Sequence, residues 1–212
     1  HSSTSWIVKR KRVTSSIELP PDLSARLAKH EKGDVIWEVP SGYRDTSKLR
    51  PAAVLLPLIK MEANWHLIYT LRSVRLHDHS GQVSFPGGSW ETQDPDLVAT
   101  ALRESWEEIG LNPGAVRVVG CMARRAMVTS FIVTPVVGIV DWPTEITVNP
   151  DEVDRVFSIP LNWLAEPANQ EFRVHTHAGV DIDIPYFKRY DGEVVWGATA
   201  MMTIEFLNLL RS

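Results

Sequence analysis

Residues 87–94, GGSWETQD, and residues 103–110, RESWEEIG, form the stretch that decides the fold. A glycine pair leads into a predicted helix whose last turns carry Glu104, Glu107 and Glu108. Because the three are spaced i, i+3 and i+4, they lie on one helix face. Like charges so placed destabilise a helix by roughly a few tenths of a kcal/mol per pair in water, and by more in a dry site.

A hard divalent cation held by carboxylate oxygens explains why the sequence tolerates this repulsion, and we expect Mg²⁺ or Mn²⁺. The predicted metal ligands are Glu104, Glu107 and Glu108. The alternative is a solvated acidic face, which is the common outcome for glutamate clusters. The glycine loop before the helix and Arg103 beside the carboxylates favour the metal site.

The same residues resemble the Nudix box, the signature of hydrolases that split nucleoside diphosphates linked to another group. The matching positions are Gly88, Asp94, Arg103, Glu104, Glu107, Glu108 and Gly110. Asp94 stands where the box usually has glutamate. Eight residues separate it from Arg103, one more than usual.

One Nudix subfamily, the coenzyme A pyrophosphatases, resembles this variant because a second motif precedes its box. The chain shows that motif at residues 71–73, LRS, and 79–88, HSGQVSFPGG, and residues 100–104, TALRE, are also similar. Further similar segments are residues 50–55, RPAAVL; 151–153, DEV; 160–161, PL; and 196–200, WGATA. The resemblance covers about residues 50–210. It departs at His77, where the family often has arginine, and at Ser130-Phe131, where we expect a glycine nearby.

The resemblance implies an α/β fold, a Nudix-type α/β/α sandwich with a mixed β-sheet and a glycine loop–helix catalytic motif. The residue patterns predict helices over 23–30, from Asp94 to Gly110 and over 198–210, and strands over 52–60, 65–71, 116–124, 131–140, 153–160, 180–187 and 193–196. Residues 1–49 are expected to form an N-terminal extension with a short helix packed on the core. Residues 50–212 are expected to form the Nudix hydrolase domain.

Composition narrows the function further. With 212 residues, of which 44% are hydrophobic, the chain suits one well-packed domain. A formal net charge of −4 argues against a dedicated nucleic-acid binder. No apolar run approaches the ~20 residues of a membrane span. The single cysteine, Cys121, excludes an intrachain disulfide and suits a reducing compartment, so we expect a cytoplasmic protein. The oligomeric state stays open, with a homodimer among the options.

The expected activity is divalent-metal-dependent hydrolysis of the pyrophosphate bond of coenzyme A or its derivatives, a small-molecule nucleotide substrate. The resemblance implies 4′-phosphopantetheine, or its acyl form, and adenosine 3′,5′-bisphosphate as products. One alternative is a Nudix pyrophosphatase for ADP-ribose, a dinucleotide or a nucleoside triphosphate. Another is a Nudix-fold module that senses a nucleotide without cleaving it. Retention of the carboxylates favours an enzyme, and residues 85–88, FPGG, favour coenzyme A.

The candidate site extends beyond the three glutamates. Glu152 is a candidate further ligand or general base, with a solvated loop glutamate as the alternative. Arg103 is expected to pair with Glu107 and to orient a carboxylate without touching substrate. Asp94 and Glu91 are expected to fix the loop. The candidate substrate-binding residues are Arg72, Arg75, His79, Gly87 and Gly88, and Arg124 and Arg125 are weaker candidates because an exposed pair is the commoner outcome.

Overall fold

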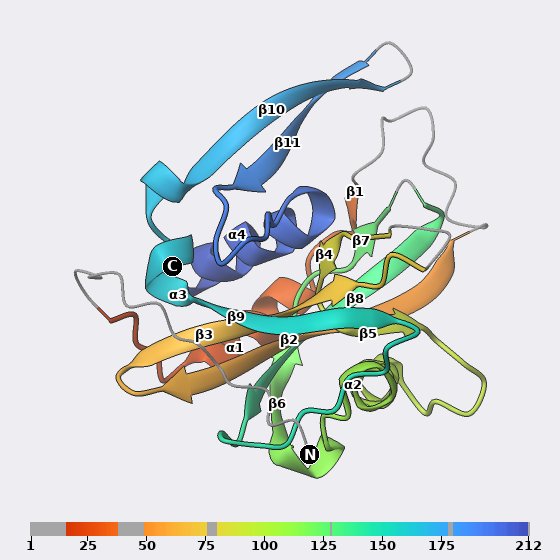
Figure 1. The fold of residues 1–212 in the computed structure, drawn as a ribbon. Helices are drawn as coiled ribbons and strands as arrows, with labels where there is room; N and C mark the ends of the chain where they lie inside the picture. Colours follow the sequence, from red (N-terminus) through yellow and green to blue (C-terminus); the bar gives the residue numbers. More distant parts are fainter. Residues whose placement is uncertain (1–15, 38–48, 76–79, 128, 178–179, 212) are drawn as a thin grey trace.

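The computed structural model describes residues 16–37, 49–75, 80–127, 129–177 and 180–211. A mixed sheet lies at its centre, with helices on both faces (Figure 1). The strands of this sheet are β1 (Ile36–Trp37), β2 (Arg50–Met61), β3 (Asn64–Arg72), β4 (Val83–Ser84), β5 (Gly87–Ser89), β6 (Val116–Cys121), β7 (Arg125–Ala126), β8 (Phe131–Val140) and β9 (Val153–Pro160). Their path runs β1-β7-β8-β2-β3-β4, with β5 on β2, β6 on β8 and β9 on β3. This arrangement is the predicted α/β class with a mixed sheet.

Strand β2 organises the two cores. It pairs parallel with β8 and antiparallel with β3 and β5, so its backbone is fully engaged. Its side chains alternate between the two faces, as strand geometry requires. Leu55 and Ile59 enter the core on one face, and Leu56 and Leu58 enter the core on the other. A strand buried on both faces needs a continuous apolar run, which is what residues 52–59 provide.

The helices divide between these faces. Helix α2 (Leu97–Ile109) packs Ala101 and Ile109 into one core. On the opposite face lie α1 (Leu23–Glu31), α3 (Leu161–Leu164) and α4 (Gly197–Arg211). Figure 1 shows α2 below the sheet and α4 above it. The three layers confirm the predicted α/β/α sandwich.

Helix α1 is held against the sheet and α4. Leu27 is fully buried in the core that α4 shares. His30 accepts a hydrogen bond at Nδ1 from the amide of Ala123, at 2.9 Å, and its Nε2 lies 3.1 Å from a carboxylate oxygen of Glu205 on α4. The predicted helix over residues 23–30 is therefore present, and it packs on the core.

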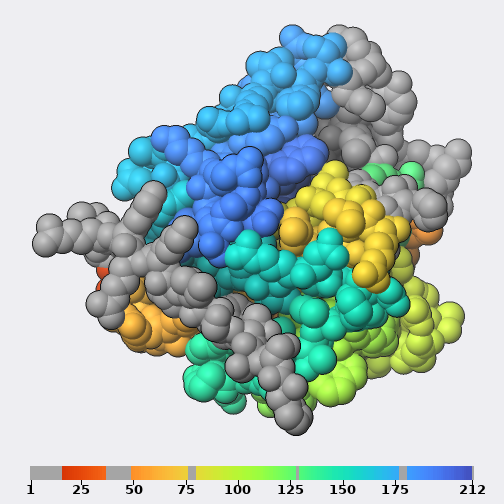
Figure 2. Space-filling view, in the orientation of Figure 1, coloured from red at the N-terminus to blue at the C-terminus, as the bar shows by residue number. Residues whose placement is uncertain are grey.

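A separate two-stranded sheet consists of β10 (Gln170–His177) and β11 (Val180–Phe187), paired from Gln170↔Phe187 to His177↔Val180. This hairpin stands beside α4 at one end of the molecule (Figures 1 and 2). The amide of Phe187 donates to the carbonyl of Val195 at 2.8 Å, which ties the hairpin to the segment that enters α4. The prediction of a strand at 180–187 is confirmed. None of the predicted strands covers residues 170–177, which form β10.

Two predicted boundaries are wrong by three residues, and one predicted strand is absent. Helix α2 begins at Leu97, because Asp96 is the residue that caps it, accepting from the amide of Ala99 at 2.8 Å. The predicted strand over residues 116–124 ends at Cys121, after a register shift between Val118 and Gly120. Residues 193–196 make only isolated bridges, because residues 191 and 192 turn the chain with positive φ. No helix among the described residues is long and apolar enough to cross a membrane.

Candidate active site

The glycine pair brings strand β5 unusually close to β2 and α2. Gly87 has φ +153°, and a Cβ there would lie 2.3 Å from the carbonyl oxygen of Ala53. A Cβ on Gly88 would lie 2.5 Å from the carboxyl carbon of Glu104. Side chains at either position would therefore collide with neighbours. The loop needs glycine so that its backbone can meet the carboxylates of α2.

Replacement of Gly88 by alanine is expected to displace the Glu104 carboxylate and to lower kcat by about ten- to a hundredfold, since a shift of ~1 Å at a catalytic centre has effects of this size. The neighbour is the end of a side chain, so the melting temperature should change little. Gly114→Ala, in a 3-10 turn away from the site, is the matched control. Full activity in Gly88→Ala would show that the position of Glu104 does not matter.

Glu108 is the most buried of the three glutamates, with its side chain 5% exposed. Its Oε2 accepts a hydrogen bond from the amide of Gly87 at 3.1 Å, and its Oε1 lies 3.7 Å from Nη1 of Arg72. Burial raises the pKa of Glu108 to about 8, and the negative charges of Glu104 and Glu152 act in the same direction. The carboxylate is thus held by the glycine loop but is short of positive charge.

Glu104 and Glu107 share the helix face with Glu108 but differ in environment. The Glu104 side chain is 15% exposed, and burial raises its pKa above the ordinary value, with Glu107 and Glu152 adding to the effect and Arg103 opposing it. The Glu107 side chain is 49% exposed and lies 2.9 Å from Arg103. Side-chain exposure on this helix face therefore increases from Glu108, through Glu104, to Glu107.

Arg103 links the loop to this face. Its Nε and Nη2 donate to the two carboxylate oxygens of Asp94 at 2.9 and 3.0 Å, and Nη2 also donates to the carbonyl of Ser89 at 2.9 Å. Nη1 lies 2.9 Å from Glu107 and 3.0 Å from Glu104. The expected pair of Arg103 and Glu107 is present. An arginine engaged by so many acceptors is suited to orienting carboxylates.

Asp94 fixes the loop from the other side of Arg103. Hydrogen bonds from Arg103 lower the pKa of Asp94 to about 2, so the residue is charged. Asp94 also accepts from the amide of Glu91 at 3.0 Å and from the hydroxyl of Thr100 at 2.9 Å. These bonds occupy the Asp94 carboxylate, which explains why Asp96, and not Asp94, caps the helix.

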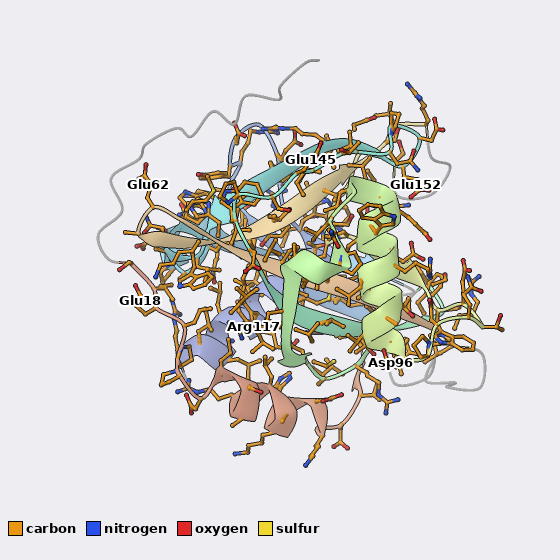
Figure 3. The ribbon with its side chains drawn as sticks, turned by 90° about the horizontal axis from the view of Figure 1, so that it is seen from below. Glu18, Glu62, Asp96, Arg117, Glu145 and Glu152 are labelled. Atoms are coloured by element: carbon orange, nitrogen blue, oxygen red, sulfur yellow. The ribbon has the colours of Figure 1, made fainter. Side chains whose placement is uncertain are left out.

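Glu152 comes from a segment distant in sequence, the turn before β9. Its carbonyl accepts from the amide of Ser73, next to Arg72, at 2.9 Å. The carbonyl of Glu108 accepts from the amide of Asn149 at 2.8 Å, which ties the same turn to α2. Figure 3 shows Glu152 near the end of α2 opposite Asp96. The negative charge of Glu152 acts to raise the pKa values of Glu104 and Glu108, which supports its candidate role beside them.

The chemistry of the donor set, hard carboxylate oxygens, suits a divalent cation. Among the described residues, however, no group of three carboxylate, histidine or cysteine side chains is positioned to hold a metal ion. Arg103 contacts Glu107, while Gly87 and Arg72 engage Glu108. The predicted ligands Glu104, Glu107 and Glu108, with Glu152 as a further candidate, nevertheless offer hard oxygens whose mutual repulsion a cation would offset.

The predicted substrate-binding residues fall in different places. Arg72 lies beside Glu108, and its buried Nε has no hydrogen-bond partner among the described residues. Arg75 is exposed and lies 3.2 Å from Asp151. Arg125 is buried, contrary to the expected exposed pair, and donates to Glu205 at 2.7 Å, whereas Arg124 is exposed. His79 and the departure at His77 lie outside the described residues.

A cavity of about 910 Å³ adjoins the glycine loop. The sheet face, the start of α4 and the β10–β11 hairpin enclose it, and most of its lining is apolar. The lining includes Arg72, Gly87 and Gly88 from the catalytic loop and its neighbour, and His175 and Trp196 from the hairpin and the segment before α4. The sequence did not predict this cavity, because residues separated by more than a hundred positions form it. Residues 196–200, WGATA, belong to this lining in part. In sequence this segment is similar to the family, but no function was expected of it.

The comparisons with known proteins agree with this geometry. The family model described as NUDIX domain matches residues 48–178. A protein of Citrobacter koseri described as an uncharacterized Nudix hydrolase NudL is 39% identical over 152 residues, covering 72% of this chain and 73% of its own. A protein of the same description from Escherichia coli O7:K1 is 37% identical over 157 residues, covering 74% and 81%.

Among solved structures, a MutT/nudix family protein from Enterococcus faecalis superposes with a TM-score of 0.50 at 12% identity, covering 81% of this chain and 64% of its own, which speaks to the fold alone. The family model spans more than half of the chain and includes the glycine loop, α2 and Glu152. The chain therefore belongs to the NUDIX domain family and is an enzyme of that family, a pyrophosphohydrolase.

Proposed function

We propose that this pyrophosphohydrolase cleaves the diphosphate bridge of coenzyme A or its derivatives, giving 4′-phosphopantetheine, or its acyl form, and adenosine 3′,5′-bisphosphate. The coarser activity, hydrolysis of a nucleoside diphosphate derivative, follows from the family. The finer assignment rests on the segment that precedes the glycine loop, because that segment resembles coenzyme A pyrophosphatases.

The observation that carries the proposal is the position of this upstream segment. Residues 82–85, QVSF, line the cavity together with Arg72, Gly87 and Gly88. The amide of Arg72 donates to the carbonyl of Gln82 at 2.9 Å, and Leu71 pairs with Val83, so the motif forms one wall beside Glu108. A segment in this position would contact the substrate on either side of its diphosphate. We therefore propose a role for residues 82–85 in substrate specificity.

The proposed site residues act by position and charge. Glu104, Glu107 and Glu108 would hold Mg²⁺ or Mn²⁺, which supplies charge neutralisation and an activated water when bound. Glu152, whose charge acts on Glu104 and Glu108, would serve as a further ligand or as the base that takes a proton from water. Arg72 would contact a phosphate oxygen, while Arg103 keeps Glu104 and Glu107 oriented. The amides of the glycine loop lie beside the same carboxylates.

Another nucleoside diphosphate derivative remains the alternative substrate, namely ADP-ribose, a dinucleotide or a nucleoside triphosphate. A panel of these compounds beside coenzyme A, with mass analysis of the products, separates the two. Release of 4′-phosphopantetheine with adenosine 3′,5′-bisphosphate at the highest kcat/KM is the expected result. Much faster turnover of ADP-ribose or a nucleoside triphosphate would contradict the proposal.

Coenzyme A is expected to exceed dephospho-coenzyme A by about tenfold or more in kcat/KM. The two differ by one ribose phosphate, and a charge-assisted contact to such a group contributes roughly 1.5–3 kcal/mol, where ~1.4 kcal/mol is a decade in rate. Neutralising the responsible cation should reduce this ratio; Arg75→Gln and Arg124→Gln are tested first, with Arg72→Gln beside them. Arg72 adjoins Glu108, so its replacement is expected to lower the rate on both coenzymes. For that variant the measure is therefore the ratio of the two kcat/KM values, not either rate alone. Equal rates on both coenzymes would mean that no residue binds the ribose phosphate.

A further inference from the structure

A row of three aromatic rings crosses the β10–β11 hairpin and reaches the segment before α4. The rings of Tyr186 and Trp196 are stacked, with centroids 5.5 Å apart and planes 11° apart. The rings of His175 and Tyr186 are also nearly parallel, with centroids 6.0 Å apart and planes 10° apart. The row joins residues from two strands and the segment beyond them. Such an arrangement is a tertiary feature that no local sequence pattern requires.

Further contacts hold Tyr186, the middle ring of this row, in place. The guanidinium of Arg173 lies 4.2 Å from the centroid of the Tyr186 ring, and the Tyr186 hydroxyl lies 3.2 Å from Nε2 of His175. Tyr186 and Trp196 also form an isolated β-bridge. These contacts occupy Tyr186, whereas Trp196 at the end of the row is half-buried and lines the cavity. The indole is therefore both supported and accessible from the cavity.

Trp196 is fixed relative to the catalytic loop. The hydroxyl of Thr199, in the first turn of α4, donates to the carbonyl of Val83 at 3.1 Å. Val83 pairs with Leu71, the neighbour of Arg72, across β3 and β4. The Thr199–Val83 hydrogen bond and the pairing of β4 with β3 thus link the chain segment that carries Trp196 to the strand that carries Arg72. A ligand that bridges the two would meet a prearranged site.

We propose that Trp196, braced by Tyr186 and His175, is the stacking surface for the purine base of the substrate. A purine is flat and presents an apolar face, which suits an indole in a largely apolar cavity, and stacking of this kind tolerates the variety of polar groups on the base edge. The diphosphate would then lie toward Arg72, Gly87 and Gly88, which line the same cavity. The inference rests on the proposed function only for the identity of the base as adenine.

The test measures binding rather than turnover. Isothermal titration of the full chain, with Mg²⁺ present, compares AMP, adenosine 3′,5′-bisphosphate and 4′-phosphopantetheine, none of which has a diphosphate bridge to hydrolyse. Trp196→Leu keeps an apolar side chain but removes the ring, and is expected to weaken both adenosine ligands by about tenfold or more, the scale of one base–aromatic stack. Trp196→Phe keeps a ring and should bind within about threefold of the wild type. The affinity for 4′-phosphopantetheine should not change in either variant.

The matched control is Phe172→Leu on the same hairpin. Phe172 is 57% exposed and, by strand alternation, points to the face opposite Arg173 and His175. Its replacement should leave all three affinities unchanged, and Trp196→Phe covers the case in which Trp196→Leu fails to fold.

The inference is overturned if the wild type does not bind AMP, if Trp196→Leu binds AMP as the wild type does, or if the phosphopantetheine affinity falls equally, which would place the other arm of the substrate on this wall. Coenzyme A hydrolysis is assayed separately. A protein that uses Trp196 to bind AMP but does not cleave coenzyme A would refute the proposed substrate alone.

Discussion

Excess chelator is expected to reduce hydrolysis to background, and added Mg²⁺ or Mn²⁺ to restore it. The reason is the charge balance of the site. Glu104, Glu108 and Glu152 already repel one another, and a diphosphate would add further negative charge. Arg72 and Arg103 alone do not offset this total, because Arg103 is engaged by Asp94 and two glutamates. Without a divalent cation, the substrate and the carboxylates cannot share the site.

The measurement is initial rate against free metal concentration after dialysis with chelator. The control is the same chelator saturated with magnesium, which should not inhibit. Full activity of dialysed, metal-free protein would mean that the carboxylate face is not a cation site. That outcome would require another source of positive charge, and Arg72 would be the first residue to examine.

Local sequence patterns were sufficient for the motif and its supporting strands. The carboxylate spacing on α2 depends only on helix periodicity, and the apolar run of β2 depends only on burial from both sides. Both were therefore predictable before any tertiary contact was known. The same holds for α1 and for β8 and β9, whose predicted and observed bounds nearly coincide.

Tertiary contacts decide the features that the sequence did not predict. Asp94 and Asp96 are equally good helix caps by type, and only the engagement of Asp94 by Arg103 selects Asp96. Arg124 and Arg125 were expected to be an exposed pair, yet Glu205 on α4, 80 residues further along the chain, provides a buried partner for Arg125. The cavity and its aromatic row arise from the packing of the hairpin on α4. Their residues carry no common spacing that a sequence pattern could reveal.

Glu108→Gln is expected to lower the rate by at least about a hundredfold while leaving the metal-free protein as stable as the wild type or slightly more so. Even partners that only support a metal ligand alter activity by about ten- to a hundredfold, so loss of a ligand itself should do at least as much. The amide oxygen of glutamine can still accept the hydrogen bond that Gly87 donates at 3.1 Å. What the substitution removes is the charge, and with it the affinity for a cation.

The stability of this variant distinguishes a functional carboxylate from a structural one. A carboxylate that is 5% exposed and close to Glu104 and Glu152 is costly to keep charged, and its distance of 3.7 Å from Arg72 is too long for a strong ion pair. Replacement by the neutral glutamine should therefore remove this cost from the metal-free protein at any pH above the ordinary pKa of a glutamate. Thermal melts of the metal-free wild type and variant measure the effect, and Glu145→Gln, an exposed glutamate, is the control.

Two outcomes would contradict the assignment of Glu108 in different ways. Full activity of Glu108→Gln with metal present would remove the residue from the metal site. A large fall in the melting temperature of the metal-free variant would mean that the charged pair with Arg72 supports the fold. The expected combination, a stable but inactive protein, arises only if the fold tolerates this buried charge and the bound cation requires it.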